Sequence, residues 1–232
     1  MEFLTRFKSV LDVTSTLMAI AAAGAVMWTV GLRSQPKASA VEEVDGLQIE
    51  SSTITNTLGT GPVALVEFSD FQCPYCQRFS SDVWPLLKKT LIDSGRARYI
   101  ALQFPLEQIH PLALAAGEAA ECAGRQGRFW DMRERLFTPN GALAAADLIE
   151  HSRQLDLRED VFKKCIEGDE TLQAIRVDQE QGKRLGVNGT PTLFTGIVQS
   201  DGSIRLVERI RGLGTADFII QRVNRLTQRE GL

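Results

Sequence analysis

Apolar positions along the chain predict strands and helices in a regular order. An apolar run over residues 63–68 predicts a buried strand, and the alternation over residues 96–104 predicts a second core strand. Between them, apolar side chains at helical spacing predict a helix that begins at Pro74, a residue that suits the first turn. Pro85 lies inside this helix and is expected to kink it, because proline has no N–H for the helical bond. This part of the chain is therefore predicted to be a β-α-β unit.

The pattern changes over residues 110–185, which are helical throughout and divided by glycine, proline and asparagine. The remaining predicted elements are an edge strand over residues 47–58, a β-hairpin over residues 192–199 and 204–210, and a final helix over residues 216–227. The expected fold class is α/β, with one domain made of residues 47–109 and 186–232. A helical domain, residues 110–185, is expected to be inserted into it.

The N-terminal part contains an uncharged segment, residues 13–32. Twenty residues of helix are about 30 Å long, enough to cross the hydrocarbon core of a bilayer. We expect a transmembrane signal-anchor here, with residues 1–12 in the cytoplasm and residues 33–46 as a linker. The alternative is a signal peptide cleaved near Ala40, but the apolar segment is long for one. Both interpretations place the rest of the chain outside the cytoplasm, in a periplasm, at a cell surface or secreted.

Composition and charge narrow the function classes. The chain has 232 residues, of which 44% are hydrophobic and 24% charged, and a formal net charge of -3. These values suit a globular protein. The sequence has no long basic block, so we do not expect nucleic acid as a partner. Four cysteines raise the alternative of a zinc site, which usually needs two closely spaced pairs. Only Cys73 and Cys76 are closely spaced, so we expect no metal ion and no cofactor.

Cys73 and Cys76 form a C-x-x-C motif at the predicted strand-to-helix junction. Thiol–disulfide exchange needs a thiolate nucleophile, and the N–H groups and dipole at a helix N-terminus favour an anion. Cys73 is therefore the predicted nucleophile. Cys76, one turn further along, is the predicted resolving thiol, which attacks a mixed disulfide at Cys73. The alternative is that both cysteines are inert or bind metal.

Two segments far apart in the sequence bear on this chemistry. Glu67 lies in an otherwise apolar strand and is either a buried proton shuttle for Cys76 or a half-exposed side chain facing water. Thr190 and Pro191 come just before a predicted strand. A cis bond between them would leave the Thr190 backbone open to an extended substrate, whereas a trans proline would only begin the strand.

Cys122 and Cys165 both fall in the predicted helical insert. In an oxidising compartment they would form a structural disulfide, which for a loop of this length stabilises the fold by roughly 3–4 kcal/mol. Two buried free thiols are the alternative, since free cysteine is often buried. His110, at the entry to the insert, is expected to cap or pack rather than to catalyse.

The sequence resembles the DsbA-like branch of the thioredoxin superfamily over about residues 47–230. The motifs that carry the resemblance are Glu67-Phe68, Phe71-x-Cys-Pro-Tyr-Cys76, Phe104-Pro-Leu106, His110-Pro111, Phe129-Trp130, Leu136-Phe137 and Leu185-Gly-Val-x-Gly-Thr-Pro191. The resemblance implies a thioredoxin fold with an inserted helical domain and the Cys73 and Cys76 roles given above. It also implies a cis bond at Pro191, facing the cysteines, and favours the Glu67 proton shuttle and a Cys122–Cys165 bridge.

The predicted function is that of a protein thiol–disulfide oxidoreductase, and we favour an oxidase. The expected partners are reduced or misoxidised client proteins, a membrane redox partner that recharges the cysteine pair, and the membrane itself through residues 13–32. Pro74 and Tyr75 are expected to bind substrate together with Thr190 and Pro191. Pro74-Tyr75 differs from the Pro-His of the best-known DsbA, so an isomerase or a reductase with the same site is an alternative. A thioredoxin-like binding module without catalysis is an alternative of another class.

Overall fold

Strand β4 (Val63–Ser69) lies inside the central sheet, and all of its residues are buried. The computed structural model describes residues 40–44, 46–138 and 142–232. These residues form a seven-stranded sheet in the order β1-β7-β6-β4-β5-β3, with β2 also paired to β7. The other strands are β1 (Ala40–Glu43), β2 (Gln48–Ile49), β3 (Thr57–Leu58), β5 (Ala97–Gln103), β6 (Thr192–Val198) and β7 (Ile204–Arg211). β4 runs parallel to β5 and antiparallel to β6, as a β-α-β unit followed by a hairpin requires.

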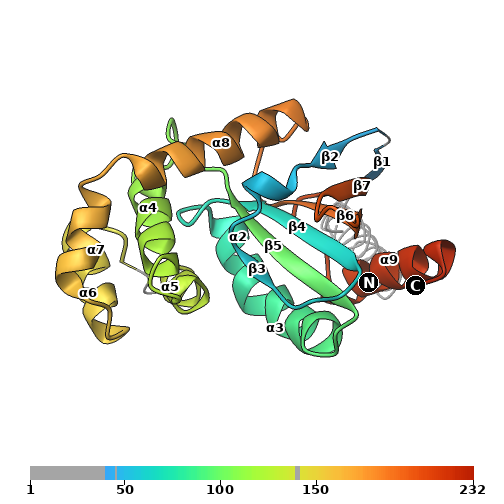
Figure 1. Ribbon diagram of the computed structural model, residues 1–232, viewed down its shortest axis with the longest axis horizontal. Helices are drawn as coiled ribbons and strands as arrows, with labels where there is room; N and C mark the ends of the chain where they lie inside the picture. Colours follow the sequence, from blue (N-terminus) through green and yellow to red (C-terminus); the bar gives the residue numbers. More distant parts are fainter. Residues whose placement is uncertain (1–39, 45, 139–141) are drawn as a thin grey trace, which may run out of the picture. The chain divides into compact units, whose positions relative to one another are not determined.

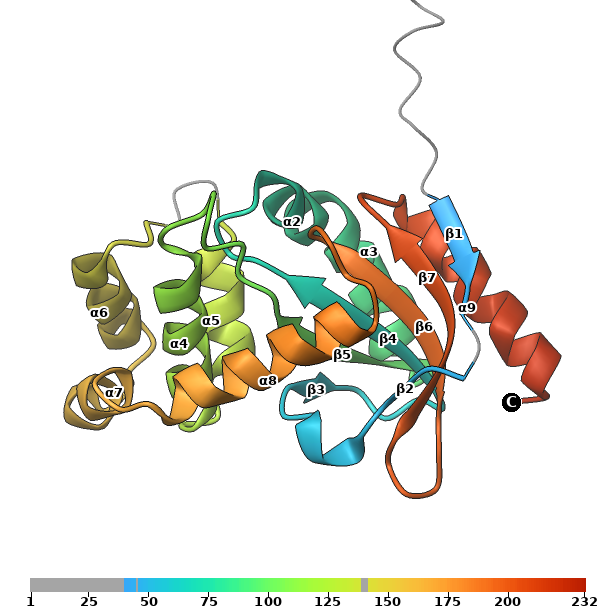
Figure 2. The same cartoon turned by 90° about the horizontal axis from the view of Figure 1, so that it is seen from above.

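Helices cover both faces of this sheet. Helices α2 (Pro74–Arg78), α3 (Trp84–Leu87) and α9 (Ala216–Glu230) lie on one face, and α8 (Glu170–Arg184) lies on the other (Figure 2). Side chains alternate along β4, so that Leu65 enters the hydrophobic cluster under α2 and Val66 enters the cluster on the other face. Glu67 follows Leu65 by two positions and therefore points to the face that α2 covers.

The helix predicted from Pro74 is present, but its hydrogen bonding is interrupted. A π-helical turn, Phe79–Val83, separates α2 from α3, and a second one, Lys88–Ile92, follows α3. Pro85 lies in the first turn of α3 and has no N–H to bond the preceding turn. The π-helical turn before Pro85 is wider than an α-helical turn and accommodates the missing bond. The kink expected at Pro85 thus takes the form of a change from α-helix to π-helix.

The helical insert packs against the α2 side of the sheet and shares its core. It contains α4 (Ala113–Gly124), α5 (Phe129–Leu136), α6 (Ala145–Gln154) and α7 (Glu159–Ile166), which lie to the left of the sheet in Figure 1. One hydrophobic cluster extends from Leu65 in the sheet to Met132 and Phe162 in the insert. Helix α8 then leads from the insert across the sheet, where a Cβ on Gly182 would lie 2.7 Å from the ring of Phe104. The insert and the sheet are therefore one packing unit.

Two N-terminal segments differ from the expected pattern. Ala40–Glu43, which falls in the predicted linker, forms β1 and pairs with β7. The expected edge strand over residues 47–58 is instead two short strands, of which β2 pairs with β7 and β3 pairs with β5. Such pairing uses backbone groups at an open sheet position, so the apolar pattern of the sequence does not reveal it.

The predicted membrane span, residues 13–32, lies outside the described residues, as do residues 1–12 and residues 33–39 of the linker. Among residues 40–44, 46–138 and 142–232, no helix is both long and apolar enough to cross a membrane.

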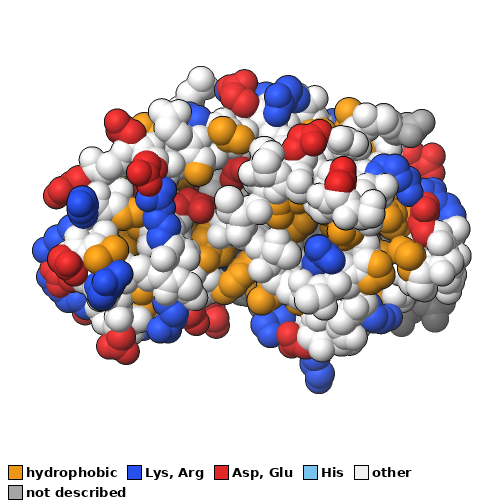
Figure 3. Space-filling view, in the orientation of Figure 1, with side chains coloured by type: hydrophobic (Ala, Val, Ile, Leu, Met, Phe, Trp, Pro, Cys, Tyr) orange, Lys and Arg blue, Asp and Glu red, His pale blue; other side chains and the backbone are white. Residues whose placement is uncertain are grey.

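Charged side chains of both signs are interspersed over the face of the molecule that Figure 3 shows. They are dense over α6 and α7, at the left of this view, whereas hydrophobic side chains show between the insert and the sheet and over the sheet itself. On this face the charges form no continuous stripe of one sign, unlike the basic surface that a nucleic acid requires.

Candidate active site

The C-x-x-C motif lies where β4 passes into α2. Cys73 is the N-cap residue of α2 and has an extended backbone conformation, and Pro74 occupies the first turn. The N–H groups of a first helical turn have no partner within the helix, so they are available to an anion at the N-cap. The predicted placement of the motif at a strand-to-helix junction is therefore confirmed.

The two cysteines are free thiols in different surroundings. The side chain of Cys73 is 4% exposed and that of Cys76 is fully buried. The Cys73 thiol donates a hydrogen bond to the Thr190 carbonyl at 3.4 Å, across a sequence separation of 117 residues. The Thr190–Pro191 peptide bond is cis. The fold thus brings Cys73 and the predicted substrate-binding turn together at one site.

These surroundings shift the acidities of the two thiols in opposite directions. Hydrogen bonding by the Cys76 thiol is the main cause that lowers the pKa of Cys73, from 9.0 to about 5. Burial opposes this shift, while hydrogen bonding by the backbone of Cys76 and Tyr75 supports it. Burial is also the main cause that raises the pKa of Cys76 well above its usual range, with further contributions from Cys73 and from the charge of Glu67. Cys73 is therefore the thiolate at neutral pH, and Cys76 stays protonated.

Asp70, a residue that we did not predict from the sequence, organises the loop that presents Cys73. Its buried carboxylate accepts hydrogen bonds from the backbone N–H groups of Gln72 at 2.7 Å, Cys73 at 3.1 Å and Leu106 at 2.8 Å. His110 Nδ1 lies 2.8 Å from the same carboxylate. His110 is thus a packing residue that ties the loop after β5 to the cysteine loop, as expected. Asp commonly accepts a hydrogen bond from the backbone N–H two residues later and so forms a turn closed by its side chain. An Asp at this position is therefore the sequence signal for such a turn.

Glu67 is completely buried and belongs to a charged network. Arg133 of α5 donates a hydrogen bond from Nη2 to Glu67 Oε2 at 2.7 Å. The same nitrogen lies 3.0 Å from the Tyr99 hydroxyl oxygen, and the Tyr99 hydroxyl in turn donates to Glu67 Oε2. Glu67 therefore does not face water, and its position beneath the motif lets its charge act on Cys76. No sequence pattern links Arg133 to Glu67, because 66 residues separate them.

Apolar side chains are exposed around Cys73. Pro74 and Tyr75 lie on the surface at the start of α2, and 57% of Tyr75 is exposed. Ile109 and Leu112 lie in the loop that Asp70 and His110 hold, and the Leu112 N–H donates to the side-chain carbonyl of Gln72 at 2.7 Å. Ile109 is 69% exposed. Large apolar side chains exposed together mark a surface that contacts another molecule.

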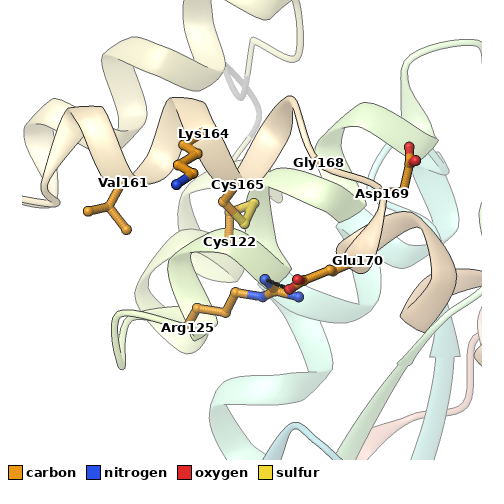
Figure 4. Close-up of a pocket in the computed structure, with 8 residues that line it drawn as sticks. All are labelled: Cys122, Arg125, Val161, Lys164, Cys165, Gly168, Asp169 and Glu170. Carbon is orange, nitrogen blue, oxygen red and sulfur yellow. Dashed lines mark hydrogen bonds and ion pairs between the residues drawn. A yellow bond between two sulfur atoms is a disulfide. The ribbon is translucent and has the colours of Figure 1, made fainter.

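Cys122 of α4 and Cys165 of α7 form a disulfide, so they are not two free thiols. A pocket of about 360 Å³ lies beside this bond, and Arg125 and Glu170 form an ion pair at its edge (Figure 4). The disulfide joins two helices of the insert and leaves Cys73 and Cys76 as a separate pair. Among the described residues, no three His, Cys, Asp or Glu side chains are grouped so as to hold a metal ion.

Comparisons with known proteins agree with this site. A family model described as thioredoxin matches residues 59–208. The Na(+)/H(+) antiporter NhaA 1 of Salinispora arenicola is 35% identical over 169 residues, which are 73% of this chain and 25% of that protein. The chain therefore spans about a quarter of the length of this antiporter. A probable disulfide bond formation protein D of Bacillus anthracis is 29% identical over 143 residues, which are 57% of this chain and 64% of that protein.

Solved structures show the same fold. The crystal structure of alpha-DsbA1 from Wolbachia pipientis superposes with a TM-score of 0.63 at 20% sequence identity, and the match covers 75% of this chain and 90% of that one. The family model covers more than half of the chain, including β4, both cysteines and the Thr190–Pro191 turn. The chain belongs to the thioredoxin family, and its fold is that of the DsbA-like thiol–disulfide oxidoreductases.

Proposed function

We propose that this protein is an extracytoplasmic oxidase that transfers a disulfide from Cys73 and Cys76 to the thiols of client proteins. The observation that carries the proposal is the contrast between the two thiols. The pKa of Cys73 is lowered to about 5, mainly by hydrogen bonding from Cys76, and burial raises that of Cys76. Exchange needs one sulfur that leaves and attacks as a thiolate and a second, protected sulfur that closes the ring.

The proposed reaction takes place in two steps. A client thiolate attacks Cys73 Sγ of the oxidised pair, so that a client–Cys73 bond forms, the Cys73–Cys76 bond breaks and Cys76 takes up a proton. A second client thiolate then attacks the client sulfur of this mixed disulfide and releases Cys73 as a thiolate. The client is oxidised by two electrons and the cysteine pair is reduced by two.

The acidity of Cys73 favours this direction of electron flow. A thiolate that hydrogen bonds stabilise makes the reduced form of the pair more stable relative to its disulfide, which then oxidises other thiols more strongly. A thiol of low pKa is also the better leaving group in the second step. An isomerase or reductase with the same site predicts a weaker oxidant.

Client binding is proposed at the surface around Cys73. The Thr190 backbone, next to the cis Pro191 and at the start of β6, is placed to pair with an extended client segment. Exposed Pro74, Tyr75 and Ile109 would contact the apolar side chains that an unfolded client exposes. Backbone pairing and apolar contacts of this kind select weakly among side chains, which suits an enzyme that acts on many sequences.

Glu67 is proposed to exchange a proton with Cys76 during each reaction. Cys76 is buried and must gain or lose a proton when its bond to Cys73 breaks or forms. The charge of Glu67 acts on Cys76, and its carboxylate is the buried acid–base group of the network below the motif. Glu67→Gln should therefore slow exchange without removing either cysteine, measured as the single-turnover rate with a dithiol peptide.

The proposed location is outside the cytoplasm, with residues 13–32 as a membrane anchor and a membrane redox partner that reoxidises the pair. The Cys122–Cys165 disulfide supports this location, because structural disulfides persist mainly in oxidising compartments. Fractionation of cells and the mass of the mature chain test the anchor, and a chain that begins near Ala40 would show a cleaved signal peptide instead. No ion transport is proposed, because the chain spans only a quarter of the antiporter that it matches.

A trapping experiment tests the function. In Cys76→Ser the second sulfur is missing, so mixed disulfides with client proteins should accumulate on Cys73 in an oxidising compartment. Cys73→Ser is the matched control and should trap nothing. If Cys76→Ser accumulates no mixed disulfides, the protein is not an oxidoreductase of this kind and the binding-module alternative gains support.

The direction of electron flow has its own test. Equilibration of the Cys73–Cys76 pair with mixtures of reduced and oxidised glutathione gives its redox potential. We expect a strongly oxidising value, well above the roughly −270 mV of thioredoxin. A value near that of thioredoxin would favour a reductase over an oxidase.

A further inference from the structure

The buried Glu67 carboxylate has a counter-charge that the inserted domain supplies. Arg133 lies on α5, in the insert, whereas Glu67 lies on β4, in the sheet. The side chains are 2% and 0% exposed, and 2.7 Å separates Arg133 Nη2 from Glu67 Oε2. A buried carboxylate without a partner would take up a proton, because desolvation disfavours its charged form. The charge on Glu67 thus depends on a helix from another part of the chain.

Aromatic rings hold the Arg133 guanidinium in place. Its central carbon lies 4.9 Å from the ring centroid of Phe137, 5.5 Å from those of Trp84 and Tyr99, and 6.0 Å from that of Trp130. These distances fall in the range of cation–π attraction. Planar guanidinium groups suit stacking on rings and a buried ion pair better than a lysine ammonium does. The arginine is therefore fixed in position before any reaction begins.

The two oxygens of Glu67 have different surroundings. Oε2 accepts hydrogen bonds from Arg133 and from the Tyr99 hydroxyl. Oε1 is buried and, within the described part of the chain, has no hydrogen-bond partner. One oxygen is thus held by the network, and the other is available to take up a proton.

We propose that Arg133 is a positioning residue for thiol–disulfide exchange, which holds Glu67 ionised for proton exchange with Cys76, so that docking of the insert completes the redox site. This inference rests on the proposed function. When Cys76 attacks a mixed disulfide on Cys73, its thiol proton passes to Glu67, the Cys73–Cys76 bond forms and the partner leaves as a thiolate. Without Arg133, the charged form of Glu67 would lose the counter-charge that its buried site provides.

Titratable groups from three elements act on the Glu67 carboxylate. Cys76 of α2, Tyr99 of β5 and Arg133 of α5 interact with it directly or through their charges. A pocket of about 320 Å³ between α3 and α5 is lined by Arg133 and, towards solvent, by the charged residues Lys88, Asp131 and Glu134. Burial raises the pKa of Tyr99 well above its usual range, so Tyr99 does not replace Glu67 as the base.

The test uses the full chain with glutathione attached to Cys73 as a mixed disulfide. Release of glutathione by Cys76 is followed by acid quench as a function of pH. We expect Arg133→Met to slow release by about tenfold or more near neutral pH, with a rate that keeps rising as pH increases. Arg133→Lys retains the positive charge and should stay within about threefold of the unmodified chain. Arg135→Met, which removes a charge from the same helix outside this network, should change nothing.

Coupling to Glu67 separates this role from general damage to the fold. Glu67→Gln should show the same slow rate and the same rising pH profile as Arg133→Met, and the double variant should lose no more than either one alone. If Arg133→Met does not fold, the comparison is made between Arg133→Lys and the double variant, in which both buried charges are removed together. The proposal would be overturned if Arg133→Met or the double variant had the pH profile of the unmodified chain. It would also be overturned if the rate of the double variant fell by the product of the two single-variant factors.

Failure of this inference is distinct from failure of the proposed function. If the unmodified chain forms no mixed disulfide and releases no glutathione, the proposed function fails. If the unmodified chain exchanges normally and Arg133→Met shows its pH profile, only the role of Arg133 fails.

Discussion

The acidity of Cys73 gives a prediction that can be worked out in numbers. Its pKa is lowered from 9.0 to about 5, with hydrogen bonding from Cys76 as the main cause. At pH 7 the ratio of thiolate to thiol should thus be about 100 to 1, compared with about 1 to 100 for a thiol without the shift. Thiolates of low pKa are weaker nucleophiles, with a loss of about 0.4–0.5 logarithmic units per pKa unit, or about 40–100-fold over this shift.

These two effects nearly cancel at neutral pH, so the shape of the pH profile is the informative quantity. We expect the rate of alkylation of Cys73 by iodoacetamide to stay nearly constant from about pH 8 to pH 6 and to reach half its maximum near pH 5. An ordinary thiol would lose about tenfold per pH unit over the same range. Mass spectrometry of the modified peptide identifies Cys73, and the ultraviolet absorbance of the thiolate provides a second measurement.

Removing the cause of the shift should remove the shift. Cys76→Ala lacks the thiol whose hydrogen bond contributes most, so the midpoint for Cys73 should move to higher pH. Cys76→Ser retains a hydroxyl donor and should move it less. Alkylation of the unmodified reduced chain that still rises about tenfold per unit between pH 6 and pH 8 would refute this account of the site.

The same shift predicts how pH affects stability. Because the pKa of folded Cys73 lies below its unfolded value of 9.0, the thiolate stabilises the folded reduced protein fully above about pH 9. This contribution declines as pH falls and is lost below about pH 5. Stability of the reduced chain relative to the oxidised chain, measured by chemical denaturation, should therefore rise between about pH 5 and pH 9. If the difference in unfolding free energy between the reduced and oxidised chains did not change with pH, the lowered pKa of Cys73 would be contradicted.

Three further predictions concern the support of the site. Asp70→Ala leaves the loop N–H groups without their shared acceptor and should lower the free energy of unfolding by about 2–4 kcal/mol in urea denaturation. A decrease of less than about 0.5 kcal/mol would show that water replaces the carboxylate. Cys122→Ala combined with Cys165→Ala opens a loop with a sequence separation of 43 and should lower the free energy of unfolding by about 4 kcal/mol. In the Cys76→Ser background, the chain without this disulfide should still trap client proteins on Cys73. Loss of trapping in a folded chain would link the disulfide to exchange. Gly182→Ala places a methyl group 2.7 Å from the Phe104 ring and should lower the free energy of unfolding by about 1–3 kcal/mol. Thermal denaturation would show this as a lower midpoint, and an unchanged midpoint would mean that α8 shifts freely.

Local patterns were sufficient for most of the elements. The strand over residues 63–68, the helix from Pro74, the helical insert and the hairpin are all visible in the spacing of apolar side chains, because burial of one face imposes that spacing. The chemistry of Cys73 and Cys76 was also local, since a C-x-x-C between a strand and a helix already implies a helix N-terminus beside the first thiol.

Pairing at the sheet edge was not predictable in this way. Ala40–Glu43 is too short and too polar to read as a strand, yet it pairs with β7 because β7 offers an open row of backbone groups. The segment over residues 47–58 likewise divides between two sheet positions. Backbone hydrogen bonds carry little side-chain information, so the sequence does not specify which strand they join.

The amino-acid sequence alone identifies the reacting groups, Cys73 and Cys76, and their position between β4 and α2. The tertiary structure alone decided what surrounds them. It brought the Thr190 carbonyl to 3.4 Å from Cys73 and Arg133 to 2.7 Å from Glu67. A local pattern reports which face of an element is buried, whereas the partner of a buried charge depends on how distant elements dock, and that is fixed only when the whole core packs.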